Sequence, residues 1–488
     1  RIFVEYPGRN AESLNMASDV SRPKFRLTPG EQRVLLLIGD LAMGFLALAA
    51  GVYFWFVEDP WIFSFPEFVV ARTPFWFYLL PLAWLLLLVD LYDLHRASNW
   101  QRTLRGVLIA AIVGGFMYLV VYFVSDDPRF INRRSVAAFL LSVILLTLFW
   151  RRMYIRLYAA QGSVRRVLVV GAGANGQTLA RVYREMTPPP FNLVGYIDDD
   201  PEKIGKDVEG FRIFASSDQL LRLIDEMNIT EVVVSITGEL RGQTFQTLLD
   251  VQENGTEVTR MQTLYEDLLG RVPIHHLESD WVLRSFLDEA RSGFFYEIGK
   301  RLIDILGAIV GLLLLLVLFP FIAIAIFIDS GWPIFYWQER LGRGGRSFEI
   351  VKFRTMRQDA EKEGKAQMAD KNDPRITRVG NFLRVTRLDE FPQFWNVLRG
   401  EMSLVGPRAE RAQWVATFQQ EIPFYRARLL VKPGISGWAQ INYGYAATVE
   451  DTSVKLEYDL YYIKHRSILM DILIILRTVG TALGGKGR

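Results

Sequence analysis

The sequence predicts a membrane protein of the α plus α/β class: a four-helix transmembrane bundle, a Rossmann-like parallel α/β domain, and a second α/β domain with a re-entrant membrane helix. Half of the 488 residues are hydrophobic, and four long apolar runs lie within the first 150 residues. From residue 164, strand and helix patterns alternate around a glycine-rich turn. The predicted parts are an N-terminal tail, the four helices, the Rossmann-like domain and the second α/β domain, at residues 1–32, 33–152, 164–290 and 298–488.

Each of the four apolar runs is close to the roughly 20 residues that a helix needs to cross the apolar core of a bilayer. They span residues 34–57, 74–92, 107–125 and 135–150. Basic residues lie before the first run, between the second and third, and after the fourth, whereas the loop at 58–73 is acidic. This distribution predicts that both ends of the bundle face the cytoplasm. The alternative is three spans and one interfacial helix, because the fourth run is short and follows Arg133 and Arg134.

The segment 164–290 predicts a parallel α/β layer of the doubly wound type. Strands are expected at 167–170, 193–197, 231–236 and 256–261, and helices near 217–226 and 242–253. Gly171, Gly173 and Gly176 form a turn that allows a phosphate to approach a helix N-terminus, and Asp198 lies where an acid would bind a ribose. Bound NAD or another nucleotide is one interpretation. The other is a regulatory or dimerising domain whose glycines only form the turn.

Tyr296 and Lys300 have the Tyr-x-x-x-Lys spacing with which short-chain dehydrogenases move a proton during hydride transfer. Both residues, however, precede the uninterrupted apolar run from Ile305 to Ile328. Aromatic and basic side chains at such a place are typical of membrane-interface anchors. We therefore expect them to anchor this run and not to catalyse hydride transfer.

This fifth apolar run is long enough to cross a membrane, but Lys and Arg residues flank it on both sides. Pro320 lies within it, removes a backbone hydrogen bond and disfavours helix at Phe319. A re-entrant helix over 302–328 that bends at Pro320 and returns to the same side keeps both flanks in the cytoplasm. Such a hairpin must pack against protein. A kinked fifth span is the alternative.

The polar segment from residue 330 carries many more arginines than acids in its central part. Lys352 and Arg354 are two residues apart on a predicted strand and therefore share one face. At a membrane surface the expected anions are lipid head groups and phosphorylated substrates. No base-stacking or groove-reading motif is present, and the net charge is only +3, so we expect no nucleic acid partner. An apolar stripe at 468–479 suits either an interfacial helix or core packing.

The stretch LDEFPQFWNVLRGEMSLVGPR places Asp389 and Glu390 just before a short predicted helix that begins near Pro392 and ends at Gly400. Adjacent side chains point in different directions, which favours two different roles. One acid could attack phosphorus while the other helps to hold a metal or moves a proton, with Mg²⁺ offsetting phosphate charge. The alternative is an N-capping acid beside a surface acid. The chain has no cysteine, which excludes a cysteine nucleophile and thiolate metal sites.

Four stretches extend over some 190 residues: KRLIDILGAIVGLLLLL, PIFYWQERLGRGGRSFEIVKFRTM, DPRITRVGNFLRVTRLDEFPQFWNVLRGEMSLVGPR and VKPGISGWAQINY. In this order they resemble the bacterial sugar transferases, which are polyprenyl-phosphate hexose-1-phosphate transferases, also called monotopic phosphoglycosyl transferases. With the four preceding helices and the Rossmann-like domain, the chain is similar to the large form of this family, of the undecaprenyl-phosphate glucose or galactose phosphotransferase type.

The resemblance implies that Asp389 and Glu390 are catalytic residues of the second α/β domain. In the family the aspartate attacks the β-phosphate of a UDP-sugar, releases UMP and forms a phosphosugar intermediate, from which undecaprenyl phosphate takes the sugar phosphate. Magnesium is required and is associated with the aspartate, so Asp389 is the first candidate metal ligand. Lys352, Arg354 and Arg408 match basic positions that we assign to phosphates.

The resemblance also implies a location and partners. Pro320 matches the break in the family's re-entrant helix. Such an enzyme is a multi-pass protein of the bacterial inner (cytoplasmic) membrane with its catalytic domain on the cytoplasmic face. It initiates exopolysaccharide, capsule or O-antigen synthesis for downstream glycosyltransferases, and a homodimer is expected.

Arg387, Phe391 and Ala409 depart from the family pattern, which has serine, leucine and proline at these places, and the departures leave the acid pair intact. Two alternatives come from other classes of protein. One is a membrane-anchored NAD-dependent nucleotide-sugar modifying enzyme, and the other is a non-catalytic assembly scaffold.

Overall fold

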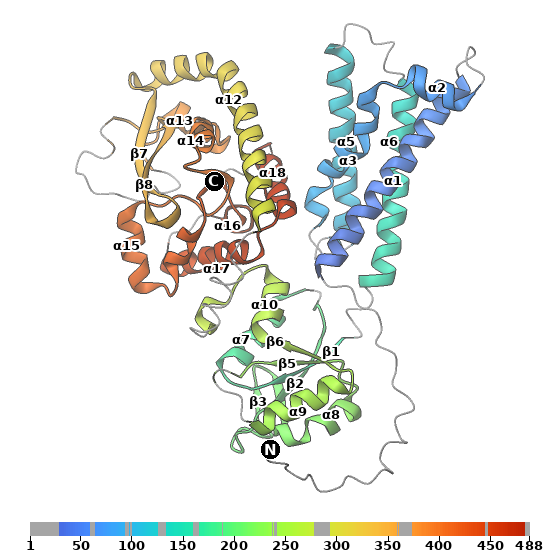
Figure 1. The fold of residues 1–488 in the computed structure, drawn as a ribbon, viewed down its shortest axis with the longest axis vertical. Coiled ribbons are helices and arrows are strands. Elements are labelled where there is room, and N and C mark those ends of the chain that lie inside the picture. The colour runs from blue at the N-terminus through green and yellow to red at the C-terminus, as the bar shows by residue number, and fades with distance from the viewer. Residues whose placement is uncertain are drawn as a thin grey trace, which may run out of the picture. The chain divides into compact units, whose positions relative to one another are not determined.

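The computed structural model describes residues 29–58, 64–92, 97, 100–124, 133–159, 165–187, 189–236, 238, 242–277, 293–358, 360, 373–444 and 448–483. The predicted tail up to residue 28 and the predicted end of the α/β domain at 278–290 lie outside these residues. The chain divides into two compact units, Arg1–Pro81 with Leu91–Leu264 and Leu82–Asp90 with Tyr265–Arg488. Figure 1 labels their helices and strands.

Four of the described helices are long and apolar enough to cross a membrane, or five if one bent pair counts as a span. Three of them belong to the first unit: α1 (Pro29–Glu58), α5 (Trp100–Val124) and α6 (Arg133–Tyr154). Helix α6 is longer than the apolar run predicted at 135–150. The short fourth run therefore belongs to a helix with the length of a span.

The run at 74–92 does not form the single helix that its composition predicts. Helix α2 (Phe65–Arg72) occupies part of the predicted loop, and η2 (Phe75–Leu79), α3 (Leu80–Leu87) and η3 (Val89–Tyr92) follow. The chain bends by 98° between the two parts of this segment. The cause is Pro74, which disfavours helical backbone at the preceding residue, and Thr73 is extended with ψ of 113°.

A buried ion pair joins α1 to α6. Arg151 Nη2 lies 2.5 Å from Asp40 Oδ2, and both side chains are fully buried. Arg151 Nη1 also donates to the Leu91 carbonyl oxygen over 2.7 Å. Because a charge in apolar surroundings is costly unless it is paired and hydrogen-bonded, this pair fixes the register of the two helices.

The α/β part of the first unit is a six-stranded sheet in the order β3-β4-β2-β1-β5-β6, parallel except where β3 meets β4. Its strands are β1 (Arg166–Val170), β2 (Asn192–Ile197), β3 (Asp207–Val208), β4 (Phe211–Ala215), β5 (Glu231–Val234) and β6 (Glu257–Arg260). Helices α8 (Leu220–Met227) and α9 (Gly242–Glu253) form a buried core with one face, and α7 (Ala174–Glu185) lies on the other (Figure 1). The predicted parallel α/β layer is present. The β3–β4 hairpin was not predicted from the sequence, because β3 has only two residues and such a short strand has no clear pattern.

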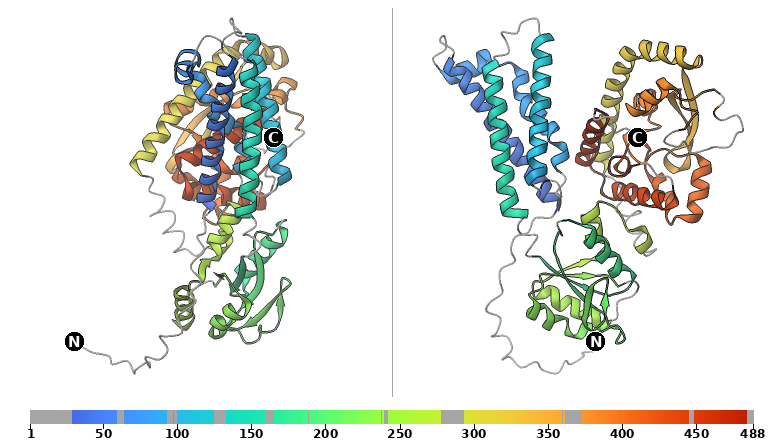
Figure 2. Two further views of the ribbon diagram at one scale, coloured as in Figure 1. Left: turned by 90° about the vertical axis from the view of Figure 1, so that its right-hand side faces the viewer. Right: turned by 180° about the vertical axis from the view of Figure 1, so that it is seen from behind.

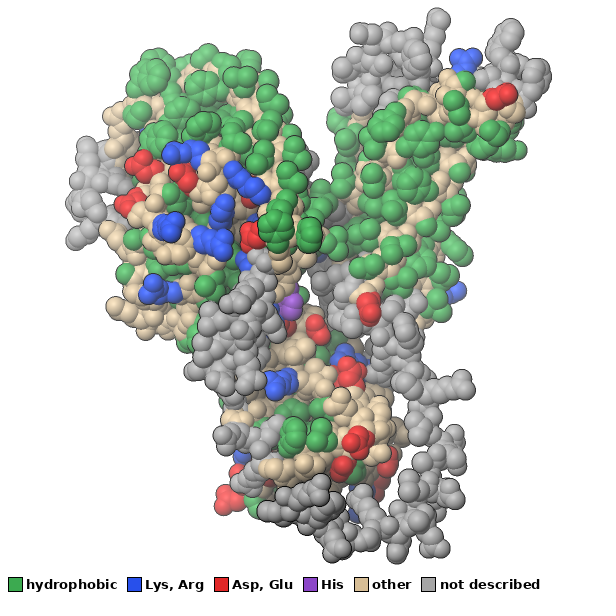
Figure 3. All heavy atoms as spheres, in the orientation of Figure 1, with side chains coloured by type: hydrophobic (Ala, Val, Ile, Leu, Met, Phe, Trp, Pro, Cys, Tyr) green, Lys and Arg blue, Asp and Glu red, His purple; other side chains and the backbone are tan. Residues whose placement is uncertain are grey.

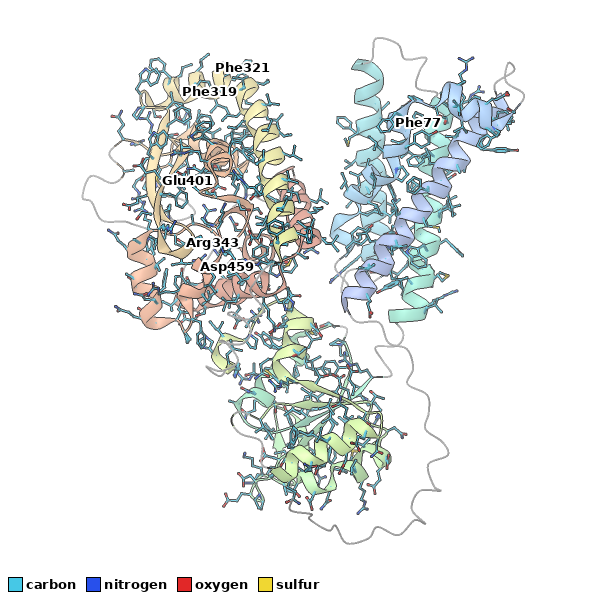
Figure 4. The ribbon with its side chains drawn as sticks, viewed as in Figure 1. Phe77, Phe319, Phe321, Arg343, Glu401 and Asp459 are labelled. Atoms are coloured by element: carbon cyan, nitrogen blue, oxygen red, sulfur yellow. The ribbon has the colours of Figure 1, made fainter. Side chains whose placement is uncertain are left out.

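Helix α12 (Phe294–Ser330) organises the second unit and is longer at both ends than the predicted 302–328. It continues through Pro320 and changes direction there, as Figures 1 and 2 show; Figure 4 labels Phe319 and Phe321 at the bend. Proline removes one hydrogen bond of the helix and clashes with the preceding turn, which explains the bend. The helix thus has a first limb before Pro320 and a second limb after it.

The first limb packs against protein through both polar and small residues. Asp304 Oδ1 accepts hydrogen bonds from Ser403 Oγ over 2.8 Å and from Leu404 N over 2.9 Å. A Cβ added at Gly307 would lie 2.4 Å from Leu404, and one at Gly311 would lie 2.4 Å from Phe394. The two glycines therefore allow a close approach that larger residues would prevent.

The second limb is also packed. Ile322 and Ile326 are buried together with Ile334, Phe353 and Leu383. Both limbs therefore contribute to the core of the unit, although Figure 3 shows that hydrophobic side chains cover the outer surface of the helix.

Tyr296 and Lys300 do not act as interface anchors in the predicted manner. Tyr296 Oη donates to Asp471 Oδ2 over 3.1 Å, and Lys300 Nζ donates to the same oxygen over 3.0 Å. Lys300 Nζ also donates to the Val405 carbonyl oxygen over 3.0 Å. Because Asp471 is 1% exposed, the two side chains complete a polar cluster inside the unit, which leaves no free Tyr–Lys pair for hydride chemistry.

The second unit contains further elements beside α12, which runs along its edge (Figure 1). They are η8 (Ile274–His276), β7 (Phe335–Leu341), η10 (Arg343–Gly345), β8 (Ser347–Phe353), α13 (Arg378–Val385), η11 (Leu388–Gln393), α14 (Phe394–Arg399), β9 (Ser403–Val405), α15 (Ala412–Glu421), η12 (Tyr425–Leu430), β10 (Gly434–Ser436), α16 (Trp438–Asn442), α17 (Val449–His465) and α18 (Ile468–Leu483). Strands β7 and β8 form an antiparallel hairpin. Ile474 of α18 is fully buried while Leu469 and Ile472 are exposed, so this helix combines core packing with an apolar outer face.

A buried carboxyl group of α17 makes the stability of this unit depend on pH. Glu457 Oε2 lies 3.3 Å from Arg271 Nε and 3.3 Å from Tyr265 Oη. Burial raises the pKa of Glu457 to about 7, and the Arg271 charge opposes this only in part. In an unfolded chain the pKa of a glutamate is about 4.3. The folded protein therefore binds more protons in the interval between these values, and its stability falls as the pH rises through that interval.

We expect the midpoint of thermal unfolding of the detergent-solubilised protein to fall between pH 5 and pH 7, and Glu457→Gln to flatten this fall. Glu253→Gln, which removes an exposed acid at the end of α9, is the matched control and keeps the wild-type dependence. An unaltered pH dependence in Glu457→Gln would assign the effect to other groups.

Candidate active site

The acid pair lies in a buried 3-10 turn that leads directly into a short helix. Asp389 and Glu390 belong to η11 and are 8% and 7% exposed. Pro392 lies inside this turn and α14 begins at Phe394, two residues after the predicted start near Pro392. The predicted end is correct, because Gly400 ends α14 in the left-handed region with φ of 83°.

Glu390 holds two cations from different parts of the chain. Lys352 Nζ of β8 and Arg408 Nη2, from the segment after β9, each lie 2.9 Å from Glu390 Oε1. Burial alone would raise the pKa of Glu390, but the Arg408 and Lys352 charges outweigh it and hold that pKa well below its usual range. The glutamate is therefore ionised, and the three side chains together carry one net positive charge.

Asp389 is placed differently from its neighbour. Among the residues that the structure describes, its carboxylate has no hydrogen bond or ion pair. Burial and the charge of Glu390 raise the pKa of Asp389, although Lys352, Arg384 and Arg408 act in the opposite direction. A buried carboxylate that has no partner in the described structure and lies beside a group of cations is suited to attack phosphorus or to bind a metal ion.

The described residues contain no group of three or more His, Cys, Asp or Glu side chains that could hold a metal ion. A cage made of protein ligands alone is therefore not found among them. Mg²⁺ is usually held by one or two carboxylates together with substrate phosphates and water. The unpartnered Asp389 carboxylate fits that arrangement, whereas Glu390 Oε1 is already engaged by two cations.

Arg354 lies apart from Lys352, although the strand pattern places them on one face. Its Nη2 donates to the Ser330 carbonyl oxygen over 2.8 Å and to the Ser330 hydroxyl oxygen over 2.9 Å, and it also reaches the carbonyl oxygen of Gly331. Arg354 thus binds the C-terminal end of α12, while Lys352 binds Glu390. Within the described part of the chain its Nε and Nη1 have no partner, so a role toward phosphate remains a prediction for these two atoms.

Two positioning residues were not predicted. Asn396 of α14 is 1% exposed, donates to the Glu349 carbonyl oxygen over 2.7 Å and accepts from Val351 N over 3.3 Å, which fixes β8 beside the acid pair. Arg428 donates to the Arg408 carbonyl oxygen over 3.2 Å and to Asp459 Oδ2 over 2.9 Å. No charged pattern in the sequence points to either residue, so neither was singled out from the sequence. Figure 4 labels Asp459 in the interior of the unit.

The glycine turn of the first unit is closed by its own hydrogen bonds. Gly171 has φ of 103°, and a Cβ added at Gly176 would lie 2.3 Å from the Gly171 carbonyl oxygen, so both positions require glycine. Asp198 Oδ2 accepts from Ala172 N over 2.8 Å and therefore binds the turn itself. Of the three glycines of this turn, only Gly173 has open space around an added Cβ. A nucleotide at this turn remains a prediction.

The two acids of the pair should have opposite effects on stability. Glu390→Gln leaves the mostly buried Lys352 and the half-exposed Arg408 without their counter-charge, so we expect the free energy of unfolding to fall. Asp389→Asn removes a buried charge that has no partner in the described structure and that repels Glu390, so we expect the free energy of unfolding to rise. Thermal unfolding in detergent with EDTA measures both changes. Equal destabilisation by the two substitutions would contradict this assignment of charges.

Two family models match the chain. The model described as bacterial sugar transferase matches residues 295–485, and the model described as CoA-binding domain matches residues 88–247. The first match contains the acid pair and both limbs of α12. The second contains the parallel sheet up to α9.

Three curated relatives illustrate the similarity. The UDP-N-acetylgalactosamine-undecaprenyl-phosphate N-acetylgalactosaminephosphotransferase of Aeromonas hydrophila is 46% identical over 47% of this chain and 53% of its own length. The UDP-glucose:undecaprenyl-phosphate glucose-1-phosphate transferase of Xanthomonas campestris pv. campestris is 33% identical over 66% of this chain and 68% of its own length. The UDP-galactose-lipid carrier transferase of Erwinia amylovora is 28% identical over 85% of this chain and 83% of its own length.

The match to the Aeromonas protein thus spans about half the length of that relative, whereas the Erwinia match extends over most of both chains. The Xanthomonas relative is matched over more than two thirds of its length at 33% identity. This chain belongs to the bacterial sugar transferase family.

Proposed function

We propose that the protein transfers a sugar 1-phosphate from a UDP-sugar to undecaprenyl phosphate and releases UMP. The observation that carries this proposal is the asymmetry of the acid pair, in which Glu390 is neutralised by two cations and Asp389 has no partner in the described structure. The names of the three relatives, each a sugar-phosphate or lipid-carrier transferase, support the same reaction.

In the proposed reaction, Asp389 attacks the β-phosphorus of the UDP-sugar. A bond forms between a carboxylate oxygen and this phosphorus, and the bond from the same phosphorus to the oxygen that bridges the two phosphates breaks. UMP leaves with that oxygen and its electron pair. A phosphate oxygen of undecaprenyl phosphate then attacks the phosphorus of the acyl phosphate, which frees Asp389 and yields a lipid diphosphate sugar.

Lys352 and Arg408 serve the phosphates in this scheme. Glu390 holds both cations 2.9 Å from one of its oxygens, so their positions are fixed before the substrate arrives. Asp389 is the residue that would hold Mg²⁺, which when bound offsets charge on the donor diphosphate. A buried nucleophile beside preorganised cations needs little rearrangement to reach phosphorus.

We further propose that α12 is a re-entrant membrane helix with both ends on the cytoplasmic face of the inner membrane. Its bend at Pro320, the packing of both limbs and the Lys and Arg residues on both flanks support this topology. The active site then lies at the membrane surface, where it can meet both a soluble UDP-sugar and a lipid phosphate. The product starts the assembly of an exopolysaccharide, capsule or O-antigen.

The first test of this proposal is UMP release by purified protein in detergent, with Mg²⁺, undecaprenyl phosphate and UDP-N-acetylgalactosamine, UDP-glucose or UDP-galactose. We expect release with one of these donors and a loss of at least about 10³-fold in Asp389→Asn, because the nucleophile is removed. Glu349→Gln, which removes an exposed acid of β8, is the matched control and keeps its activity. Undiminished release from Asp389→Asn would refute the nucleophile, and UDP in place of UMP would refute the reaction class.

The topology of α12 can be tested because the chain contains no cysteine, so a single introduced thiol has no background. Glu297→Cys lies before the apolar part of α12 and Glu349→Cys lies after it, and both positions are exposed. In sealed spheroplasts we expect an impermeant maleimide to label neither thiol, and in inverted vesicles to label both. Labelling of one position in each preparation would show a conventional span.

A further inference from the structure

A pocket lies beside the N-terminal part of α12, and no step of the proposed chemistry uses it. Four separate segments of the second unit line it, and its volume is about 40 Å³. Its lining residues are Glu297, Lys300, Arg301, Asp304, Arg343, Val431, Lys432 and Arg466. Five of these eight side chains are cations, so the pocket is strongly basic for its size.

The acids of this pocket, Glu297 and Asp304, are fewer than its five cations. Lys300 is paired with Asp471, which does not line the pocket. Arg301 donates to the carbonyl oxygens of Val397 and Leu398 over 2.8 Å. Arg343 and Lys432 are the cations on which the inference depends.

Lys432 has no hydrogen bond or ion pair among the described residues, and the same is true of Arg343. Lys432 Nζ and Arg301 Nη2 lie 3.6 Å and 3.5 Å from the place that a Cβ on Gly400 would occupy, so the two cations converge on one point. Burial lowers the pKa of Lys432, and the charges of Arg301 and Arg343 lower it further. Like charges held close together repel one another, and an anion bound between them would relieve this repulsion.

The surface beside the pocket is apolar. On α12 the pocket residues Glu297, Lys300, Arg301 and Asp304 follow a helical spacing and share one face. The adjacent face carries exposed hydrophobic side chains: Phe295 87%, Ile298 44%, Leu302 56% and Leu306 64%. Figure 3 shows Lys and Arg side chains gathered on this unit beside the hydrophobic surface of α12 and α18, and Figure 4 labels Arg343.

We propose that this pocket binds the phosphate of a membrane lipid, with the acyl or prenyl chain lying along the exposed face of α12. A phosphate without a chain would gain nothing from the adjacent apolar face, whereas a lipid phosphate uses both surfaces. The proposal rests on the membrane location given under the proposed function, and two lipids share the required chemistry. One is the undecaprenyl phosphate acceptor, and the other is an anionic phospholipid such as phosphatidylglycerol.

The test is direct binding of radiolabelled undecaprenyl phosphate and of radiolabelled phosphatidylglycerol to the full-length protein in neutral detergent. The double variant Arg343→Gln with Lys432→Gln should weaken binding of one of the two lipids by roughly 10-fold or more. Arg346→Gln removes one positive charge from the β7–β8 turn that also carries Arg343, but Arg346 does not line the pocket. This variant should bind both lipids as the wild type does. Arg343→Lys with Lys432→Arg keeps both charges and should restore binding.

The two sources give different results. Weaker binding of undecaprenyl phosphate alone, with a raised KM for this acceptor in UMP release, identifies the acceptor. Weaker binding of phosphatidylglycerol alone, with an unchanged KM for the acceptor, identifies a phospholipid. Wild-type binding of both lipids by the double variant would overturn the proposal.

The proposed function is judged by a separate result. UMP release by the wild-type protein does not depend on the lipid-binding measurement, and lipid binding can be measured in Asp389→Asn, where no turnover occurs. A failure of either proposal therefore leaves the other to be decided on its own data.

Discussion

The candidate active site depends on one ion triplet, in which Lys352 and Arg408 share a single oxygen of the buried Glu390. Its members come from β8, from η11 and from the segment after β9, so the triplet forms only when these elements are packed together. With Asp389 included, two cations face two carboxylates and the group is formally neutral. Substrate phosphates bring additional negative charge, which explains why a reaction at this site would need a divalent cation as well.

The triplet also separates the roles of two adjacent acids. Glu390 is kept ionised by its partners, and moving it would leave the mostly buried Lys352 and the half-exposed Arg408 without their counter-charge. Asp389 has no such restraint within the described structure, and burial beside Glu390 favours any change that reduces its charge. In the proposed reaction this carboxylate becomes part of an acyl phosphate, and the negative charge then lies on the phosphate oxygens beside Lys352 and Arg408.

The sequence predicts those features that depend on short-range patterns. The strands of the parallel sheet follow from apolar runs beside Gly171 and Gly176, and the end of α14 follows from Gly400. The local pattern also singles out Asp389 and Glu390 as candidate catalytic residues, which stays a prediction. The partner of Arg354 does not, because the end of α12 lies more than 20 residues away in sequence and only tertiary packing joins them.

Long-range packing explains the other differences. Lys300 carries the charge and position of an interface anchor, but Asp471 meets it from α18, a helix about 170 residues later in the chain. Asn396 acts through the carbonyl oxygen of Glu349, a backbone contact that no side-chain pattern records. Pro74 restricts the backbone of Thr73, so the break before Pro74 could have been predicted from the sequence. The uniformly apolar composition of 74–92 favoured a single helix instead.

The position of the basic pocket connects the membrane surface to the triplet. A smaller hollow of the same unit is lined by Arg408, Glu410 and Arg428 together with Gly342, Val431 and Pro433. The basic pocket is lined by the neighbouring residues Arg343, Val431 and Lys432. The two hollows therefore share one wall, and cations line both. In the proposed arrangement a lipid phosphate in the basic pocket is separated from the hollow of Arg408 by a wall that contains Val431, so cations of both hollows can act on the same phosphate.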